Sequence, residues 1–336
     1  MTDLTTGYLG FALRNPLVAS ASPLSHTVDG VRRLVDGGVA AVVLHSLFEE
    51  ELEDEAARHA SLAEAGADSF AESLSYFPPL PDLAHGRQHL DLVERAVRAV
   101  DVPVIASING ATAGGWTGFA RRLQDAGAAA IELNIAPFAT DPDVSGRDVE
   151  ARHVDILGLV KQAVQVPVVV KLHPYFSSMA DMARRLEDAG ADGLVLFNRF
   201  LAPDIDARRL AVSMAVGLSE PADGRLARTW IALLRRQRRM ALAASTGVEG
   251  PEDVATYLLA GADVVMTTSS LLRHGPSHAA ALLDGLAAWM AACGFTDVGQ
   301  LRGLLAAQPV AGDGTGPRSG YVAALRAANA NMAGPW

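Results

Sequence analysis

Two asparagines, Asn134 and Asn198, hold matching positions in two similar stretches of the chain, each just after an apolar run. Their spacing is roughly 60 residues, the length of two strand–helix units of a parallel barrel or sheet. The two carboxamides would therefore follow alternate strands and lie at the rim where such barrels carry out their chemistry. Shared motifs support the repeat: Val102-Pro103-Val104 recurs as Val166-Pro167-Val168, and Ala126-Gly127-Ala128 recurs as Ala189-Gly190-Ala191.

Lys171 is the only lysine in the apolar runs that we expect to be strands. A buried ammonium group is costly unless it meets an anion or loses its charge. The position therefore suits a residue that contacts an anionic cofactor, or one that forms a Schiff base with a carbonyl substrate. A lysine that only reaches into solvent is the remaining alternative.

Two polar turns follow the last two apolar runs, and each precedes a helical segment. They are Ser245-Thr246-Gly247-Val248 and Thr267-Thr268-Ser269-Ser270. The free backbone N–H groups at the start of a helix bind phosphate, and barrels commonly use the loops after strands seven and eight for this purpose. The pair of turns therefore predicts a phosphate site.

Eight short apolar runs, separated by amphipathic segments of helical length, would position these residues. Continuous apolar character is typical of strands that are buried on both faces. No GxGxxG motif follows the first run, so a doubly wound dinucleotide-binding sheet fits less well. The sequence predicts an α/β protein, a (β/α)₈ TIM barrel. The eight predicted strands are Leu17–Ser20, Ala40–Leu44, Val104–Ser107, Ala130–Leu133, Val168–Leu172, Gly193–Phe197, Ala241–Ala244 and Val264–Met266.

We expect one barrel domain over residues 1–275 and a helical extension over residues 276–336 that packs on it. A long insertion, residues 47–90, follows the second strand and can form an active-site wall or a subunit contact. The loops 136–149 and 199–223 follow the two asparagine-bearing strands and are candidate lids.

Composition excludes several classes of protein. The net charge of −10 and the pI near 5.3 disfavour nucleic-acid binding. Cys293 is the only cysteine, so this chain cannot build an intrachain disulfide, a thiolate zinc cluster or an iron–sulfur centre alone, and we expect no metal site. No apolar run approaches the length of a membrane span, and residues 1–3 lack signal-peptide character, so we expect a cytoplasmic protein without membrane contact.

An ordered set of motifs over about residues 5–275 resembles the dihydroorotate dehydrogenase family. The motifs are Asn15-Pro16-Leu17-Val18-Ala19-Ser20-Ala21, Glu132-Leu133-Asn134, Val170-Lys171-Leu172-His173-Pro174, Ala189-Gly190-Ala191-Asp192-Gly193 through Asn198, Ser245-Thr246-Gly247-Val248 and Ala260-Gly261-Ala262. The resemblance implies a barrel that binds FMN. It places Ala19, Ser20 and Ala21 along the flavin, Lys171 at the electron-rich edge of the ring, Asn134 and Asn198 toward flavin and substrate, and Thr246, Gly247, Thr268 and Ser269 at the phosphate. His45, Ser46, Asn109 and Ser245 complete the expected cofactor site.

The chain departs from this family where the catalytic base is expected. The family's loop carries a Cys or Ser that removes a substrate proton, whereas here the residues after Asn134 are Ile135-Ala136-Pro137-Phe138. Dihydroorotate is therefore a doubtful substrate. His45 stands where the family has a lysine and is a candidate acid or base, because histidine titrates near neutral pH. Ser145 and Tyr76 would reach inward from a loop, although Ser145 also suits a turn beside Gly146; His173 and Arg199 are candidates for binding a carboxylate.

The resulting prediction is an FMN-dependent oxidoreductase that acts on CH–CH groups. Hydride would pass between the flavin N5 and a small, anionic substrate, with Lys171, Asn134, Asn198, His45 and Ser145 as site residues. Two alternatives stay open: a phosphate-binding lyase or aldolase with Lys171 as the Schiff base, and a flavin-binding subunit without activity of its own. A redox partner protein and a homodimer are further expectations.

Overall fold

Eight parallel strands form a closed barrel, as predicted, in the computed structural model, which describes residues 2–51, 84–110, 116–135, 141–198, 204–213 and 217–306 together with residues 322 and 326. The strand order runs β4-β3-β13-β12-β9-β8-β7-β6, and pairing of β4 with β6 closes the ring. Each strand coincides with one of the predicted apolar runs. The strands are β3 (Leu17–Ala19), β4 (Ala41–Val43), β6 (Val104–Gly110), β7 (Ala130–Ile135), β8 (Val168–Leu172), β9 (Gly193–Leu196), β12 (Ala241–Ala244) and β13 (Val264–Thr267).

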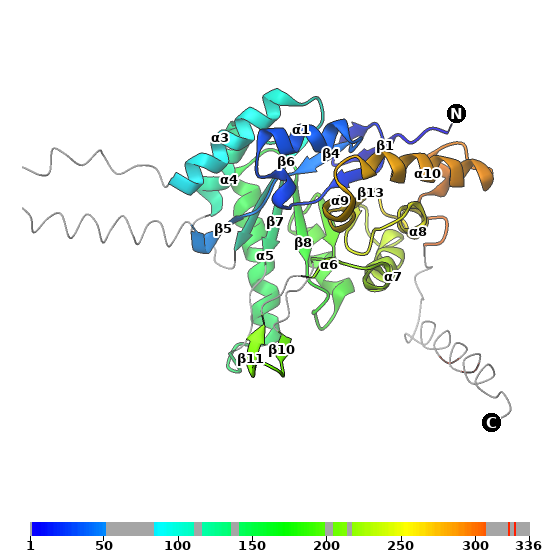
Figure 1. The fold of residues 1–336 in the computed structure, drawn as a ribbon. Coiled ribbons are helices and arrows are strands. Elements are labelled where there is room, and N and C mark those ends of the chain that lie inside the picture. Colours follow the sequence, from blue (N-terminus) through cyan, green and yellow to red (C-terminus); the bar gives the residue numbers. More distant parts are fainter. Residues whose placement is uncertain are drawn as a thin grey trace, which may run out of the picture.

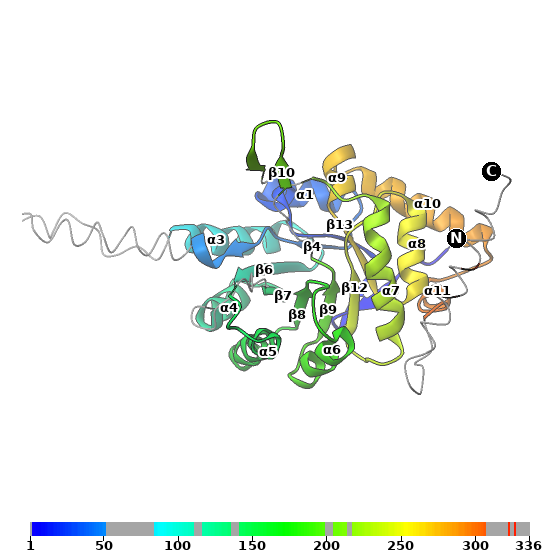
Figure 2. The same cartoon turned by 90° about the horizontal axis from the view of Figure 1, so that it is seen from below.

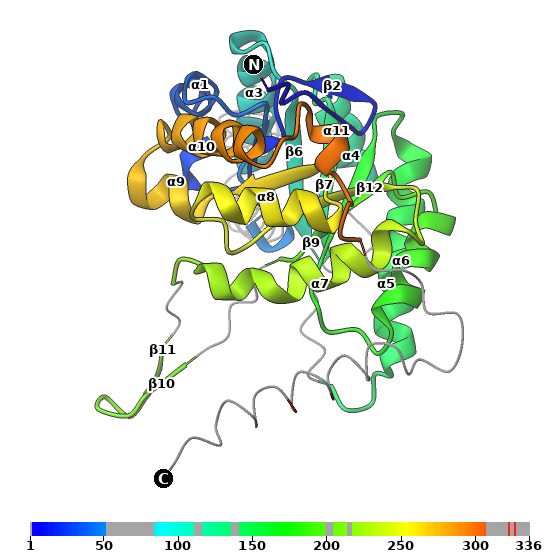
Figure 3. The same cartoon turned by 90° about the vertical axis from the view of Figure 1, so that its right-hand side faces the viewer.

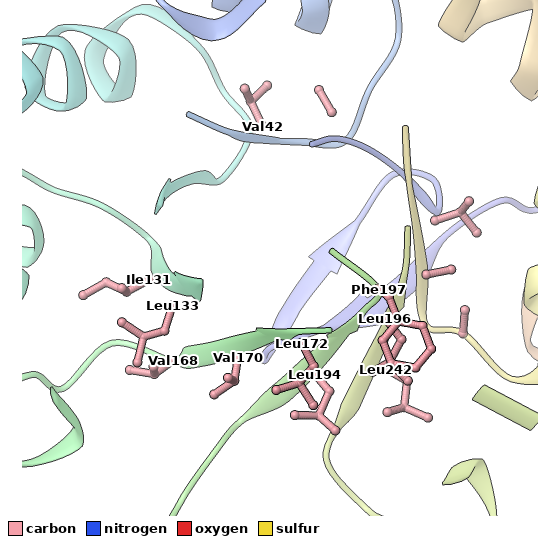
Figure 4. Packing of buried hydrophobic residues seen from close by; sticks show 14 of the residues in the cluster. Val42, Ile131, Leu133, Val168, Val170, Leu172, Leu194, Leu196, Phe197 and Leu242 are labelled. Carbon is pink, nitrogen blue, oxygen red and sulfur yellow. The ribbon is translucent and has the colours of Figure 1, made fainter. Parts of the chain in front are cut away.

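The strands are apolar on both faces because each face meets a different layer of the core. Side chains alternate between the two faces of a strand. In β8, Val169 belongs to the cluster that fills the barrel, whereas Val168, Val170 and Leu172 belong to the cluster between barrel and helices. Figure 4 shows part of this second layer, with side chains from β7, β8, β9 and β12 gathered along the strands. Burial on both faces explains why the continuous apolar runs predicted the strands correctly.

A ring of helices surrounds the barrel (Figure 2). Thr27, Ser145 and Ser178 cap α1, α5 and α6 by accepting a hydrogen bond from a backbone N–H in the first turn. In the described part of the chain, no helix is long and apolar enough to cross a membrane. The helices are α1 (Val28–Asp36), α3 (Ala84–Ala99), α4 (Trp116–Asp125), α5 (Gly146–Ala163), α6 (Met179–Asp188), α7 (Gly224–Arg235), α8 (Pro251–Ala260), α9 (Ser269–His274), α10 (His278–Ala292) and α11 (Val298–Leu301), with single 3₁₀ turns η1 (Pro23–Ser25) and η3 (Pro221–Asp223).

The repeated small-residue motif ends helices at the amino-terminal side of the barrel. Gly38, Gly127, Gly190 and Gly261 all have positive φ, which a glycine adopts without strain. Each of these turns leads directly into β4, β7, β9 or β13. The motif therefore belongs to the scaffold.

A short hairpin closes the amino-terminal end of the barrel. It consists of β1 (Thr6–Tyr8) and β2 (Phe11–Leu13), which pair in antiparallel fashion. Tyr8 and Leu13 are buried against the inner cluster of the barrel. A second hairpin, β10 (Asp204–Asp206) with β11 (Ala211–Ser213), projects from the body of the protein (Figures 1 and 3). Neither hairpin was expected from the sequence, because strands of three residues are too short for an alternating pattern to stand out.

The predicted insertion and lid loops are more regular than expected where the structure describes them. In the insertion, β5 (Leu47–Phe48) pairs with the end of β6, residues 52–83 lie outside the described residues, and α3 begins at Ala84. Residues 146–149 of the first loop already belong to α5, and the second loop contains the β10–β11 hairpin. Residues 136–140, 199–203 and 214–216 lie outside the described range. The function of these loops as lids stays a prediction.

The helix α10 packs against α8 and against the turn that ends α1 (Figure 3). Its Gly285 lies against Pro251 at the start of α8, and its Leu283 lies beside Gly38. Most of the chain after residue 306 falls outside the described range. The division into a barrel over 1–275 and an extension over 276–336 stays a prediction.

Candidate cofactor and active site

The inner face of the barrel changes from apolar to polar toward the carboxyl ends of the strands. In β7, Ala130 belongs to the inner cluster, and Glu132 and Asn134 follow it on the same face. In β8, Lys171 follows Val169 in the same way. The register of the sheet sets Asn109, Asn134 and Lys171 side by side on three neighbouring strands. One rim of the barrel thus collects the polar groups that the sequence places at strand ends.

The two asparagines of the internal repeat meet directly. Asn198 Nδ2 donates a hydrogen bond to Asn134 Oδ1 over 2.9 Å, across the end of β8 that lies between β7 and β9. The backbone N–H of Asn198 is held by the carbonyl of Leu172 at 2.7 Å. Asn134 is buried and Asn198 half-buried. The shared bond fixes the orientation of one oxygen and one amide, and the remaining amide and carbonyl groups are available to a ligand.

Lys171 lies deeper than the rim and is paired with a carboxylate. Its Nζ lies 3.4 Å from Oε1 of Glu132 and 3.4 Å from the hydroxyl of Ser20. Glu132 also accepts a hydrogen bond from Ser107 Oγ at 3.4 Å, and Ser107 exchanges a 2.9 Å hydrogen bond with Ser46. Glu132 is fully buried, and Lys171 is 7% exposed. The ammonium group thus meets an anion from the protein itself.

A cavity of about 260 Å³ opens beside Lys171 at the carboxyl end of the barrel. Polar residues of the two predicted phosphate turns line it together with Lys171 and Asn198. A third segment, residues 217–219, completes the wall. Ser219 connects the turns, because its hydroxyl donates to Ser269 Oγ at 2.9 Å and accepts from the N–H of Gly247 at 3.2 Å. The predicted site residues that line the cavity are Ser20, Ala21, Lys171, Asn198, Ser245, Thr246, Gly247, Thr268 and Ser269.

The turn after β12 is held in a conformation that few residues adopt. Thr246 and Gly247 both have positive φ, 80° and 71°. The hydroxyl of Tyr257 is buried beneath the turn and donates to the carbonyl of Thr246 at 2.6 Å, with the carbonyl of Ser245 at 3.2 Å. A Cβ on Gly247 would lie 2.5 Å from the backbone nitrogen of Gly224. The close approach leaves room at position 247 only for glycine.

His45 follows β4 and stands in a cluster of three histidines. Its ring centroid lies 3.9 Å from that of His26 and 4.8 Å from that of His89. Burial lowers the pKa of His45, and the charge of His26 lowers it further. Burial, together with His45 and His26, lowers the pKa of His89 to about 3. Burial and the neighbouring His26 therefore favour the neutral imidazole of His45, the form that accepts a proton.

The remaining predicted residues lie apart from the cavity lining. The Ala19 side chain packs in the layer between barrel and helices, and the half-buried Ser46 and Asn109 stand at the rim. Ser145 is exposed at the start of α5, where its hydroxyl donates to Asp148 Oδ2 at 2.6 Å and accepts from the Asp148 N–H. His173 is half-buried, and its pKa is lowered by burial, by His153 and by the charge of Lys171. Tyr76 and Arg199 lie outside the described residues.

Two residues of the site were missed by the reading of the sequence. Glu132 was noted only as part of a motif, although a carboxylate inside a buried apolar run needs a cation, and Lys171 was the only lysine in those runs. Ser219 comes from a loop and reaches the site through the fold alone, so no local pattern identified it. Among the described residues, no group of three or more His, Cys, Asp or Glu side chains is arranged to hold a metal ion.

A larger cavity of about 930 Å³ lies at the opposite end of the barrel, beneath the β1–β2 hairpin. Its polar lining includes Asp263, which pairs with Arg235 and Arg302 and accepts the N–H of Leu242. These contacts tie α7 and residue 302 to the barrel. Conserved chemistry in such barrels belongs to the carboxyl ends of the strands, so we assign the smaller cavity, and not the larger one, to function.

The smaller cavity fits the FMN that the resemblance implies. Ser269 Oγ accepts from Ser219 and so keeps its own hydrogen for a ligand, and this hydroxyl together with the glycine turn at 247 suits a phosphate group. The hydroxyls of Thr246 and Thr268 donate to the carbonyls of Phe197 and Ser20 and shape the wall of the cavity. Lys171 supplies a positive charge and Asn198 an amide beside them, which suits a polar ring with an electron-rich edge. The donor set therefore agrees with a flavin mononucleotide.

Comparison with known proteins gives the same family. The family model described as dihydroorotate dehydrogenase matches residues 79–290. The chain is 29% identical over 316 residues, 90% of this chain and 98% of the relative, to the dihydroorotate dehydrogenase B (NAD(+)) catalytic subunit of Methanothermobacter thermautotrophicus. It is 30% identical over 272 residues, 73% of this chain and 88% of the relative, to the putative dihydroorotate dehydrogenase A (fumarate) of Aeropyrum pernix. The chain belongs to the dihydroorotate dehydrogenase family, whose members are FMN-dependent oxidoreductases that act on CH–CH groups.

Proposed function

We propose that this protein oxidises or reduces a carbon–carbon bond of a small anionic substrate that is bound above Lys171, between the flavin site and the asparagine pair. The observation that carries the proposal is the hydrogen bond between Asn134 and Asn198 at the rim of the cavity that Lys171 and the phosphate turns line. FMN, when bound, supplies the acceptor or donor of hydride at its N5. The residues of this chain would bind and orient the substrate and exchange its proton.

The asparagine pair would orient the substrate. Asn198 donates one amide hydrogen to Asn134, which leaves its second amide hydrogen and the amide group of Asn134 for the substrate. Such a fixed pair recognises a planar group that has donors and acceptors on one edge. A ligand lacking those groups would leave buried amides unpaired, which costs about 1–3 kcal/mol for each group.

His45 is the proton acceptor that the site favours. The sequence after Asn134 carries alanine and proline where the family has its Cys or Ser, so those two positions offer no group that exchanges a proton. His45 is half-buried after β4, beside Ser46, and its lowered pKa favours the neutral imidazole. Ser145 is committed to capping α5. In the oxidative direction, one C–H bond would release hydride and the neighbouring carbon would release its proton to His45.

The ion pair between Lys171 and Glu132 favours a charge role for Lys171 over a Schiff base. A Schiff base forms from a neutral amine that can reach the substrate carbonyl. Here Lys171 Nζ lies 3.4 Å from a buried carboxylate and is engaged in an ion pair. A lysine of this kind suits the electron-rich edge of the flavin.

Electrons would leave or enter through an acceptor outside this chain. With a single cysteine, the chain has too few thiolates for an iron–sulfur cluster of its own. The Methanothermobacter relative is named as the catalytic subunit of an NAD(+) enzyme, and the Aeropyrum relative is named for fumarate. We propose a partner protein or a small diffusing acceptor. A homodimer and a cytoplasmic location complete the proposal.

Anaerobic mixing of the FMN-loaded protein with a panel of small dihydro acids, dihydroorotate included, tests this function. We expect at least one carboxylate-bearing compound to bleach the flavin absorbance. His45→Asn should keep the FMN content and lose most of the bleaching rate. A His45→Asn protein that is bleached at the wild-type rate would remove His45 from the mechanism.

His26→Gln is the matched control for the histidine cluster. It removes a charge that lowers the pKa of His45 but leaves the imidazole of His45 in place. A base must be neutral to accept a proton, so activity is lost as pH falls through its pKa. The acid limb of the pH–rate profile should therefore move to higher pH in His26→Gln, with the rate at high pH retained. An unmoved limb would show that a different group accepts the proton.

A further inference from the structure

A fully buried carboxylate lies next to the cofactor cavity without lining it. Glu132 has no exposed surface, comes from the middle of β7 and points into the barrel beneath Asn134. Burying a carboxylate costs free energy, and an apolar side chain of similar size could fill the same place in the barrel. The position therefore calls for an explanation beyond stability.

The contacts of Glu132 are directed toward the site. Its Oε1 lies 3.4 Å from Lys171 Nζ and accepts from Ser107 Oγ at 3.4 Å. Its other oxygen, Oε2, is buried and has no hydrogen-bond partner among the residues that the structure describes. On the side of the hairpin, Tyr8 is buried, and its pKa is raised well above its ordinary value by burial and then by the charges of Glu132 and Asp263. The field of Glu132 thus reaches across the barrel interior.

Only one of these neighbours also lines the cavity. Lys171 is among the lining residues, whereas Glu132, Ser107 and Tyr8 are not. Any influence of Glu132 on a ligand is therefore exerted through Lys171 or through space. Because little water separates the groups, their charges are weakly screened.

We propose that Glu132 is a positioning residue that holds the Lys171 ammonium at the edge of the cavity and offsets part of its charge, so that it lowers the reduction potential of bound FMN. The inference rests on the proposed function only in that FMN occupies this cavity. A cation at the edge of the ring stabilises the negative charge that the flavin gains on reduction. A carboxylate behind that cation weakens the effect and makes the reduced cofactor a stronger donor.

The test is the midpoint potential of bound FMN in the full-length protein, measured spectroscopically against a reference dye. Glu132→Gln keeps an oxygen acceptor for Lys171 and Ser107 but removes the charge. We expect the midpoint potential of Glu132→Gln to be about 30 mV higher than that of the wild type, which for a two-electron couple is a change of about tenfold in the ratio of reduced to oxidised FMN. Lys171→Met should shift the potential downward, and the double variant should lie near the wild type.

Ser107→Ala is the matched control, because it removes the hydrogen bond from Ser107 to Glu132 and leaves the charge of Glu132 in place. Its potential should stay close to that of the wild type. The inference is overturned if Glu132→Gln behaves like Ser107→Ala, or if Glu132→Gln and Lys171→Met shift the potential in the same direction. Opposite shifts cannot arise from a common loss of packing.

Two outcomes separate this inference from the proposed function. A wild-type protein that takes up no FMN would contradict the proposed function, and no potential could then be measured. A protein that binds FMN, but whose midpoint potential is the same with and without the Glu132 carboxylate, would contradict this inference alone. If Glu132→Gln does not fold, the Lys171→Met protein is compared with the double variant, because the two differ by the same carboxylate charge. The potential of the double variant should be higher by a similar amount, and equal potentials would count against Glu132.

Discussion

Gly247→Ala tests whether the turn after β12 holds the cofactor phosphate. The residue has φ of +71°, which an L-residue adopts at a cost of about 1–2 kcal/mol. The added Cβ would lie 2.5 Å from the nitrogen of Gly224 and 2.9 Å from the carbonyl oxygen of Glu220. Both atoms belong to the backbone, so no side-chain rotation relieves the clash, and overpacking of this kind adds about 1–3 kcal/mol. The turn must therefore shift from the position that it holds in the wild type.

The expected result is weaker binding of FMN by at least roughly tenfold, since about 1.4 kcal/mol corresponds to a factor of ten. The assay is fluorescence titration of the FMN-free protein with FMN and, in parallel, with riboflavin, which lacks the phosphate. The loss should be larger for FMN than for riboflavin.

Gly250→Ala provides the control in the same loop. Gly250 has φ of −125°, and the nearest atom to an added Cβ is Asp253 Oδ2 at 4.0 Å. An alanine there should bind FMN as the wild type does. The reasoning is refuted if Gly247→Ala and Gly250→Ala bind FMN equally tightly, or if Gly247→Ala weakens riboflavin and FMN to the same extent.

Three further predictions concern the scaffold and the rim. Tyr257→Phe removes the hydroxyl that donates to the carbonyl of Thr246, and urea unfolding should show that the free energy of unfolding falls by about 1–2 kcal/mol. An unchanged urea midpoint would mean that the carbonyl finds another partner. The pKa of His89 is lowered to about 3 in the folded protein, so its contribution to the free energy of unfolding is fully present above the unfolded pKa near 6.5. That contribution is lost as pH falls from about 6.5 toward 3, by up to about 1.4 kcal/mol per pH unit. His89→Leu should flatten this part of the plot of unfolding free energy against pH, and an equally steep plot would assign the slope to other groups. Asn198→Ala should lower kcat/KM of the substrate found by the panel more than it lowers Tm, while equal losses in both would make the bond to Asn134 structural.

The strands and the polar rim could be predicted because they depend on local pattern. A parallel strand buried on both faces needs an unbroken apolar run, and the runs ending at Ser20, Leu44, Leu133 and Leu172 all became barrel strands. The pairing of Asn134 with Asn198 followed from the period of the repeat, since alternate strands bring equivalent ends to one rim.

The rest depends on contacts between distant segments. Ser219 reaches the phosphate turns only because its loop folds back beside α9, and nothing in its own sequence marks it. The His26–His45–His89 cluster joins three separate elements, so its effect on the pKa of His45 could not be inferred from His45 alone. Ser145 differs, because a serine before Gly146 and Asp148 has a local task as a helix cap that its own neighbours indicate, while its part in catalysis stays a prediction.

The proposed activity requires a substrate that is oxidised or reduced at the rim formed by Asn134 and Asn198. The direct measurement is anaerobic stopped-flow absorbance of the FMN-loaded protein after mixing with dihydro acids that carry a carboxylate, compared with the uncharged amides of the same compounds. We predict rapid bleaching of the flavin by at least one acid and slow or no bleaching by its amide. A flavin that no member of the panel reduces, or that acid and amide reduce equally fast, would contradict the proposal.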